Sequence, residues 1–434
     1  MRCSSLQIIK LMNISKICDK LRAGSDTLAL QTASQKNTAL SAVISSIEKN
    51  RAAILSANAE DVAAARSKGM TESLVERLAL DDKKINSIID SIKIIISQID
   101  PIGEETAGWK TPNGMTIRQI RVPLGVVAII YESRPNVTAD AFSLAYKSGN
   151  AILLRGSSSA LKSNKAIVAA IKEGLSSSEA QGFGVPEAIE LAPCESHDEV
   201  QEILTAVGKV DVALPRGGAK LINMVVETAK VPVIQTGAGV CHLYVDESAN
   251  LEMAEEIAWN AKTQRPGACN AIECILVNEK VAEEFLPKLA KRFAGTVELR
   301  ADEESYKILN LCKSEKSVVS KASDDDFGFE FLDMICAVKV VSDVNEAISY
   351  INTHNTKHSE CIVTENRANA RLFQAKIDAA CVYVNSSTRF TDGGEFGFGA
   401  ELGISTQKLH ARGPMGIKAL TTTKYLIDGD GQVR

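Results

Sequence analysis

Apolar residues recur every three or four positions through the first hundred residues, for example in LSAVISSIEKNRAAIL at residues 40–55. This spacing places the apolar side chains on one face of a helix. Alanine, leucine, lysine and glutamate are also plentiful between residues 14 and 100. We therefore expect a group of helices in this region, each of which buries one face against a later part of the chain.

From residue 123 the pattern changes to short β-branched and aliphatic runs that alternate with helical stretches. The predicted strands are VVAII, AILLR, AIELA, VDVALP and VPVIQ, and the predicted helices are TADAFSLAYKS, ALKSNKAIVAAIKEGL, HDEVQEILTAV and GAKLINMVVETA. Strands that alternate with helices in this way form βαβ units with right-handed crossovers. The stretch therefore predicts a parallel, doubly wound sheet with ligands at the carboxyl ends of its strands.

A second α/β stretch runs from Cys241 to about Ala400, with predicted strands HLYV, AIECILV, AVKVV, ECIVT and CVYVN. A glycine-rich loop between Thr391 and Gly416 is a candidate rim for a substrate site. Two polar strands lie outside these sheets, one at residues 114–122 and one in the final stretch ALTTTKYLIDGDGQVR. Because such strands have open edges, we expect them to pair with another chain.

Composition narrows the class of protein. The 434 residues are 45% hydrophobic and 24% charged, which suits a folded protein of two or three domains. A net charge of -5 argues against nucleic acid or an anionic membrane as a partner. No apolar run approaches the roughly 20 residues of a membrane span. The ten cysteines show no CxxC spacing, so we expect free thiols in a reducing cytoplasm.

Two predicted strand–helix junctions carry candidate ligand groups. The first, after residues 126–130, contains Arg134 and Asn136, and its free backbone N–H groups suit an oxyanion or a phosphate, although an ordinary turn has the same pattern. The second offers Arg155, Gly156 and Ser157, a combination that could cradle a nucleotide phosphate. No GxGxxG follows any predicted strand, so the usual dinucleotide motif is missing.

Cys269 is the sharpest local feature, because it stands in a loop broken by Pro266 and Gly267, with Lys262 and Arg265 nearby in sequence. Neighbouring cations can lower the pKa of a thiol and make it a nucleophile. A single cysteine taken alone is more often a buried core residue. His354 and His358 have a spacing that could bind metal on a helix, but the segment is polar and lacks a third ligand, so we expect no metal site.

Taken together, SRPN, LLRGSSS, LPRGGA, QTGAG, RPGACNA and EFGFGAELGISTQKLHARGPMGI occur in an order that resembles the aldehyde dehydrogenase superfamily. With the segment VNEAISYINTHNTKHSECIVT, they resemble more closely its γ-glutamyl phosphate reductase family, over nearly the whole chain after Met12. The resemblance implies an α/β protein with a Rossmann-type cofactor domain, an α/β catalytic domain and a small β oligomerisation flap. It implies an N-terminal extension at residues 1–12, a cofactor-binding domain at 13–113 and 123–240, a catalytic domain at 241–411, and oligomerisation strands at 114–122 and 412–434.

The resemblance also implies roles for individual residues. Cys269 would be the nucleophile, and Asn136 would hold the substrate oxygen. The implied cofactor contacts, with NADPH favoured over NADH, are Arg155, Gly156, Ser157, Gly217, Gly218 and Asp333. The candidate substrate contacts are Arg134, Lys262 and Arg265 for the phosphate and, by position alone, Ser386, Ser387 and Arg389 for the amino and carboxylate groups.

The family comparison also bears on the reaction. Oxidising relatives carry a glutamate that activates the hydrolytic water, whereas the matching stretch here begins with Gln235. An amide cannot accept that proton, so reduction of an acyl phosphate, here in proline biosynthesis, is favoured over hydrolytic oxidation. The alternatives are a hydrolytic or coenzyme-A-acylating aldehyde dehydrogenase on the same fold and a catalytically silent scaffold. The resemblance further implies a cytoplasmic homo-oligomer whose substrate comes from a separate glutamate 5-kinase, with channelling between the two enzymes as a hypothesis.

Overall fold

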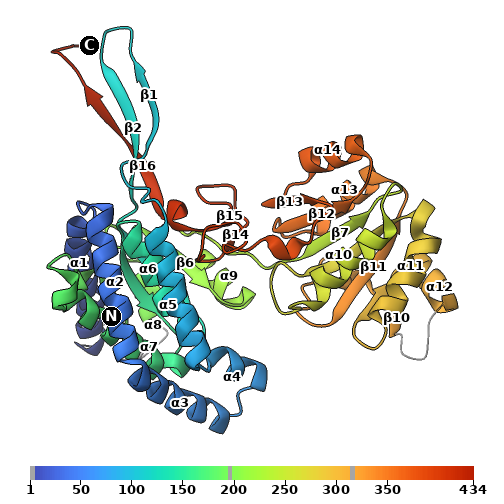
Figure 1. The fold of residues 1–434 in the computed structure, drawn as a ribbon, viewed down its shortest axis with the longest axis horizontal. Helices are drawn as coiled ribbons and strands as arrows, with labels where there is room; N and C mark the ends of the chain where they lie inside the picture. The colour runs from blue at the N-terminus through green and yellow to red at the C-terminus, as the bar shows by residue number, and fades with distance from the viewer. Residues whose placement is uncertain (1–4, 194–197, 313–317) are drawn as a thin grey trace. The chain divides into compact units, whose positions relative to one another are not determined.

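The computed structural model describes residues 5–193, 198–312 and 318–434 (Figure 1). The chain forms two compact units. Unit 1 contains the chain up to Gln235 together with Gly397–Gly403 and Met415–Arg434, and unit 2 contains Thr236–Phe396 and Ile404–Pro414. Each of the two predicted α/β stretches therefore has a sheet of its own, and the predicted α/β architecture is confirmed.

Unit 1 begins with the helices that the apolar pattern predicts. They are α1 (Ser5–Leu28), α2 (Ala33–Lys49), α3 (Arg51–Ser67), α4 (Glu72–Leu78) and α5 (Asp82–Ser97). Thr32 and Gln35 form a reciprocal capping box at the start of α2, which satisfies backbone N–H groups that have no partner inside the helix. Of the predicted extension at residues 1–12, the first four lie outside the described residues, and α1 begins within the remainder.

The sheet of unit 1 is parallel, with strand order β5-β4-β3-β6. Its strands are β3 (Val126–Tyr131), β4 (Ala151–Arg155), β5 (Ile189–Leu191) and β6 (Val212–Arg216), and the helices between and after them are α6 (Asn136–Lys147), α7 (Leu161–Ser176), α8 (Asp198–Leu204) and α9 (Ala219–Thr228). The chain moves outward from β3 to β5 and then crosses to β6 on the other side of β3. In a doubly wound sheet such a reversal marks the ligand crevice at the carboxyl ends of the two strands.

One predicted strand of unit 1 does not form. The segment VPVIQ at residues 231–235 makes only a single parallel bridge, between Val233 and Ala213 of β6. Pro232 interrupts the segment and has no N–H group to donate, which explains why the pairing stays local.

A three-stranded antiparallel sheet forms a flap in unit 1 (Figure 1). Its strands are β1 (Glu105–Lys110), β2 (Thr116–Pro123) and β16 (Thr421–Asp428), with β2 in the middle. The two polar strands predicted from the sequence are β2 and β16. Strand β1 was not predicted, because residues 105–113 were assigned to the cofactor-binding domain. In the structure, β1 pairs with β2, with Trp109 opposite Ile117 and four further residue pairs.

Unit 2 holds a parallel seven-stranded sheet of order β10-β9-β11-β8-β7-β12-β13. Its strands are β7 (Cys241–Val245), β8 (Ile272–Asn278), β9 (Glu298–Ala301), β10 (Val319–Lys321), β11 (Ile335–Val341), β12 (Ser359–Val363) and β13 (Cys381–Val384). The sequence patterns predicted all of these except β9 and β10. Those two strands are short. The residues of β9 alternate between half-buried and buried, and β10 has no buried residue, so no apolar run marks either strand.

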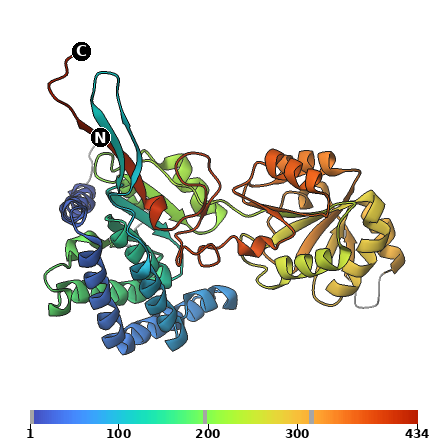
Figure 2. The same cartoon turned by 45° about the horizontal axis from the view of Figure 1, so that its top comes forward.

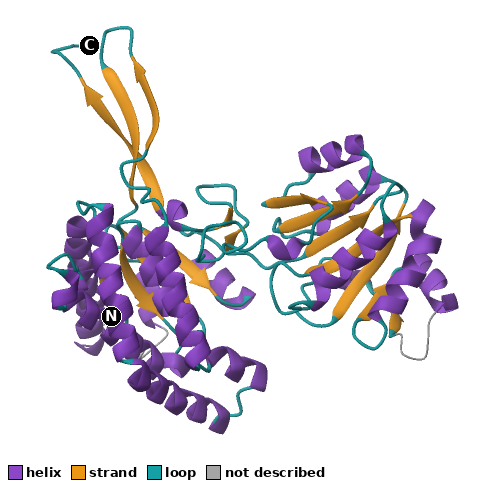
Figure 3. Ribbon diagram, viewed as in Figure 1, coloured by secondary structure: helices purple, strands orange, loops and turns teal. Residues whose placement is uncertain are grey.

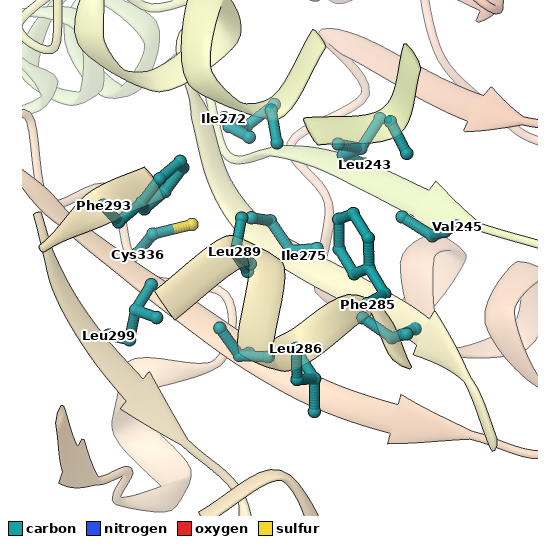
Figure 4. Packing of buried hydrophobic residues seen from close by; sticks show 14 of the residues in the cluster. Leu243, Val245, Ile272, Ile275, Phe285, Leu286, Leu289, Phe293, Leu299 and Cys336 are labelled. Atoms are coloured by element: carbon teal, nitrogen blue, oxygen red, sulfur yellow. The ribbon is translucent and has the colours of Figure 1, made fainter. Parts of the chain in front are cut away.

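Helices cover both faces of this sheet, as the views in Figures 2 and 3 show. They are α10 (Leu251–Thr263), α11 (Glu279–Phe293), α12 (Glu303–Cys312), α13 (Val344–His354) and α14 (Arg367–Lys376). On one face, Leu243 and Ile275 pack with Phe285 and Leu289 of α11 (Figure 4). On the other face, alternate strand residues such as Tyr244 pack against α13 and α14. Burial on both faces explains why these strands read as continuous apolar runs.

The glycine-rich loop contains little regular structure. Its one strand pair joins β14 (Ile404–Ser405) to β15 (Gly413–Pro414). Short 3₁₀ turns complete the fold at η1 (Ser158–Ala160), η2 (Ser178–Ala180), η3 (Pro186–Ala188), η4 (Asp324–Asp326), η5 (Thr388–Phe390) and η6 (Ile417–Leu420).

Candidate active site

The predicted site residues fall into two groups, one in each unit. The group in unit 1 contains Arg134, Asn136, Arg155, Gly156, Ser157, Gly217 and Gly218. The group in unit 2 contains Lys262, Arg265, Cys269, Asp333, Ser386, Ser387 and Arg389. Within each unit the structure brings some of these residues together and separates others.

The strand order of unit 1 predicts a ligand crevice where β3 and β6 end. Glu132 follows β3, and its carboxylate accepts a hydrogen bond of 3.1 Å from the backbone N–H of Gly218, at the start of α9. A Cβ atom on Gly217 would come within 2.6 Å of the Glu132 carboxyl carbon, so the Glu132 side chain would have to move if this glycine were replaced. The loop after β6 therefore lies directly against the loop after β3, as expected for a ligand crevice.

Asn136 is the first residue of α6, and its amide faces a carboxyl group. Its Nδ2 donates a hydrogen bond of 3.1 Å to Asp140 Oδ2, one helical turn further on. Burial raises the pKa of Asp140 to about 6, while the Asn136 hydrogen bond and the positive charge of Arg216 oppose that rise. Asp140 thus fixes the orientation of the Asn136 amide. The sequence analysis singled out Asn136 but gave Asp140 no role.

The raised pKa of Asp140 predicts a pH-dependent stability. The folded protein holds this proton more tightly than the unfolded chain, so the contribution to stability is complete below the ordinary pKa of 3.8 and is lost as the pH rises through about 6. We expect the difference in free energy of unfolding, Asp140→Asn minus wild type, to rise by about 2 kcal/mol as the pH is raised from 4 to 7. Full burial would give a larger rise, but the Asp140 side chain keeps some exposure. Urea denaturation across this pH range measures the difference, with the exposed Asp90→Asn as control. A difference that does not change with pH would contradict the prediction.

Hydroxyl groups connect the two predicted phosphate-binding junctions. The Ser159 hydroxyl lies 2.6 Å from that of Ser133, after β3, and 2.8 Å from that of Ser157, after β4. A side chain on Gly156 would approach Asn164 Nδ2 to 2.2 Å, so the backbone is closely packed here. Arg155 ends β4 at the same edge of the sheet. The structure thus places these two junctions side by side.

Cys269 lies in the loop between α10 and β8, and its side chain is half-buried. Two tight turns shape this loop, because the N–H of Ala268 donates to the carbonyl of Arg265 and the N–H of Ala271 donates to the carbonyl of Ala268. The Sγ of Cys241, at the start of β7, donates a hydrogen bond of 3.3 Å to the Cys269 carbonyl. The candidate nucleophile is therefore held at the amino end of the sheet of unit 2.

A glycine segment packs against the Cys269 loop. A side chain on Gly239 would come within 1.5 Å of the Cys269 carbonyl oxygen, so only glycine fits. The Gly239 N–H donates a hydrogen bond of 2.6 Å to the carboxylate of Glu330, and burial raises the pKa of this carboxyl. Asp333, which the sequence analysis selected, is instead exposed and accepts from the N–H of its own neighbour, Met334. The sequence FEFLD at residues 329–333 contains both carboxylates, and only the fold shows which of them contacts Gly239.

Two arginines lie near the thiol. Arg389, in the turn after β13, is half-buried, and its Nε donates a hydrogen bond of 2.9 Å to Gln264. Burial and the neighbouring charge of Arg265 lower the pKa of Arg389, whereas the proximity of Cys269 raises it. Arg265 itself is exposed. These predicted substrate contacts therefore do lie together around Cys269, in an arrangement suited to an anion.

Three other predicted substrate contacts form bonds within the protein. Ser387 is buried, and its hydroxyl caps the turn η5 by accepting from the Arg389 N–H. The carbonyl of Ser386 accepts from the Cys361 thiol. Lys262 is fully buried and forms an ion pair of 2.5 Å with Glu273, so its ammonium group is not available to a substrate phosphate. The sequence placed Lys262 near Cys269 correctly but did not show that its side chain points into the core.

The histidines are also structural. His358 is buried, burial lowers its pKa to about 4, and its Nδ1 lies 2.8 Å from the Ser359 hydroxyl. His354 ends α13 and contacts the Tyr350 carbonyl. In the part of the chain that the structure describes, no three His, Cys, Asp or Glu residues group in a way that would hold a metal ion. Among the same residues, no helix is both long and apolar enough to span a membrane.

Comparison with known proteins gives the family. Residues 7–308 match a family model described as "Aldehyde dehydrogenase family". A gamma-glutamyl phosphate reductase from Alkaliphilus oremlandii is 52% identical over 417 residues, which cover 96% of this chain and 98% of the relative. One from Dictyoglomus turgidum is 49% identical over 423 residues, which cover 97% and 99%.

Solved structures agree with these relatives. The crystal structure of gamma-glutamyl phosphate reductase from Thermotoga maritima matches with a TM-score of 0.92 and 47% identity, covering 98% of this chain and 100% of that one. An acetylating aldehyde dehydrogenase from Geobacillus thermoglucosidasius, 17% identical, shares the fold with a TM-score of 0.69 over 99% of both chains. The chain therefore belongs to the aldehyde dehydrogenase family and, within it, to the gamma-glutamyl phosphate reductases.

Proposed function

We propose that this chain reduces L-glutamyl 5-phosphate to L-glutamate 5-semialdehyde and phosphate, with NADPH as the reductant, as a step of proline biosynthesis. Relatives that match almost the whole chain carry the name of this activity. The observation on the molecule itself that supports it best is the half-buried side chain of Cys269, in a loop that contains Arg265 and is hydrogen-bonded to the turn of Arg389. A thiolate next to two cations suits attack on an activated, anionic acyl group.

The proposed steps assign work to a few residues. The Cys269 thiolate attacks the γ-carbonyl carbon, the bond to the phosphate oxygen breaks, and phosphate leaves with its electron pair. Arg265 and Arg389 stabilise the negative charge of the substrate and of the leaving phosphate. Asn136 keeps the role that the resemblance implies, as a donor to the substrate oxygen. NADPH, when bound, supplies the hydride that reduces the Cys269 thioester, and the resulting thiohemiacetal releases the aldehyde and restores the thiol.

The crevice of unit 1 suits a dinucleotide. It lies at the switch point of the sheet, and Gly156 and Gly217 stand in the loops that follow β4 and β6. Arg155 and Ser157 are our candidates for the ribose 2′-phosphate, which would favour NADPH over NADH. For a ribose hydroxyl near the reacting end, Glu330 is a candidate beside Asp333, because its carboxylate contacts the glycine segment that packs against the Cys269 loop.

The proposal extends to partners and location. The flap leaves β1 and β16 as edge strands, with Tyr425 and Ile427 exposed, so we propose that it pairs with another copy of this chain. A separate glutamate 5-kinase would supply the acyl phosphate, and direct transfer between the enzymes would limit its hydrolysis. Action in the cytoplasm suits a mechanism that depends on a reduced thiol.

The reverse reaction tests the proposed function. Purified protein is mixed with glutamate semialdehyde and NADP⁺, and NADPH absorbance is followed with and without inorganic phosphate. We expect at most one equivalent of NADPH per enzyme without phosphate and continued NADPH formation only with it, because phosphate must release the acyl group before a second turnover. Continued NADPH formation without phosphate would mean that water releases the acyl group, which would make the chain a hydrolytic aldehyde dehydrogenase. A requirement for coenzyme A in place of phosphate would identify the acylating alternative.

A further inference from the structure

We propose that Asn270, the residue after Cys269, is a positioning residue that holds Arg389 beside the nucleophile to receive an anionic group of the substrate. The identity of the substrate rests on the proposed function, whereas the placement of Arg389 rests on contacts within unit 2. Cys269 and Arg389 are far apart in sequence, and no pattern along the chain links them.

The Asn270 side chain joins the nucleophile loop to the turn that carries Arg389. Asn270 is only 4% exposed. Its Nδ2 donates hydrogen bonds of 2.9 Å to the Thr391 carbonyl and 3.3 Å to the Arg389 carbonyl. Its backbone carbonyl accepts a hydrogen bond of 2.6 Å from the Thr388 hydroxyl. Three bonds from one residue therefore fix residues 388–391 against the loop of Cys269.

A second anchor holds the same turn from the opposite side. The Thr391 hydroxyl lies 2.7 Å from the Ser359 hydroxyl and 2.8 Å from that of Tyr383. Ser359 in turn contacts His358 Nδ1 at 2.8 Å. Both residues belong to the HNTKHSE segment, which the sequence analysis singled out without a chemical role. This segment thus supports the turn, and Asn270 sets the distance between the turn and the thiol.

The guanidinium of Arg389 is left available by these contacts. Its Nε is bonded to Gln264, and no carboxylate within the described ranges lies at ion-pair distance from it, although the nearby negative charge of Asp392 raises its pKa. Arg265 adds a second positive charge close by. A half-buried guanidinium that keeps its terminal nitrogens free suits a carboxylate or a phosphate, which it can bind through two parallel hydrogen bonds. Glutamyl phosphate carries both groups.

The field of Arg389 at the thiol can be measured without any substrate. Iodoacetate and iodoacetamide alkylate the same sulfur atom, but only iodoacetate is an anion, so the ratio of their rate constants at Cys269 reports the local positive charge. Mass spectrometry identifies the alkylated residue. For Arg389→Met we expect the ratio to fall about fivefold, the size of effect expected from one nearby charge at moderate dielectric. For Asn270→Ala and Asn270→Ser we expect a smaller fall in the same direction, larger for alanine because serine keeps one donor.

Asn278→Ala is the matched control. Asn278 lies at the other end of β8, is equally buried, and donates to the Ser342 carbonyl and the Tyr244 hydroxyl. It should lower stability while leaving the alkylation ratio unchanged. In the double variant Asn270→Ala/Arg389→Met, the ratio should fall no further than in Arg389→Met alone, because Asn270 acts through Arg389. An unchanged ratio in Asn270→Ala or in Arg389→Met would overturn the proposal, and so would additive effects.

Turnover distinguishes this inference from the proposed function. In the reverse assay, Asn270→Ser should raise the KM for phosphate or semialdehyde more than it lowers kcat, because the chemistry of Cys269 is unchanged. If the assay shows no dependence on phosphate while the alkylation ratios behave as expected, the proposed function fails and the role of Asn270 stands. A loss confined to kcat would instead assign Asn270 to the nucleophile itself and contradict the proposal.

Discussion

Replacing Cys269 with alanine should reduce phosphate-dependent NADPH formation at least about a thousandfold, because the variant lacks the thiol that carries the proposed acyl intermediate. The effect belongs on kcat, since the proposed cofactor site of unit 1 and the arginines near the thiol are unchanged. Quenching of protein fluorescence by NADP⁺ should give the same Kd for the variant and the wild type. Together these measurements separate a lost nucleophile from a misfolded protein.

Cys274→Ala is the matched control for this experiment. Cys274 lies within β8, a few residues from Cys269, but burial raises its pKa well above the ordinary value, so it stays a thiol. Its replacement should change kcat less than about twofold, because the core loses only one small buried side chain. Substantial activity in Cys269→Ala, or a comparable loss in Cys274→Ala, would mean that the reaction does not pass through a Cys269 thioester.

The largest expected effect on stability comes from Lys262→Met. The side chains of Lys262 and Glu273 are 0% and 1% exposed. Among the described residues, each forms an ion pair only with the other. Removing one member leaves a buried charge without its partner, which costs about 3–5 kcal/mol of unfolding free energy. Urea denaturation monitored by circular dichroism measures this loss. Adding Glu273→Leu to the variant should recover much of it.

The cost of Lys262→Met should also depend on pH. Burial raises the pKa of Glu273 to about 7 even though Lys262 opposes the rise, and loss of Lys262 removes that opposition. The variant can therefore keep Glu273 protonated at pH 6, whereas the folded state is penalised increasingly as the pH rises to 8.5. Lys280→Met is the control, because Lys280 pairs with Glu247 on the surface, with side chains 64% and 39% exposed, and should cost less than about 1 kcal/mol. Equal losses in the two variants would contradict the argument.

Sequence reasoning found the elements whose buried apolar residues recur at a regular spacing along the chain. Strands β3 and β8 are buried on both faces and read as apolar runs, and the five isoleucines on one face of α5 show the helical period. Strand β1 could not be found in this way, because all six of its residues are exposed and only its pairing with β2 defines it.

The candidate site was predictable in its loops but not in its side-chain directions. Lys262 and Arg265 stand three residues apart at the end of α10, yet one points into the core and the other into solvent. Arg389 was chosen by position and does lie near Cys269, but its connection through Asn270 is a long-range hydrogen bond that leaves no pattern in the sequence. Glu330 and Asp333 differ only in which of them the fold turns toward Gly239.

The return of the chain to unit 1 has a consequence for biosynthesis. Strand β2 pairs with β16, about 300 residues later, and the Asn150 amide donates to the Leu420 carbonyl across a similar gap in the sequence. During translation, unit 2 is therefore synthesised in full while the middle strand of the flap still has one unpaired edge. Contacts of such sequence separation form slowly, and an unpaired strand edge is prone to misassembly. The nascent chain should thus depend on chaperones longest at this strand, which stays unprotected until the ribosome has made the residues that cover it.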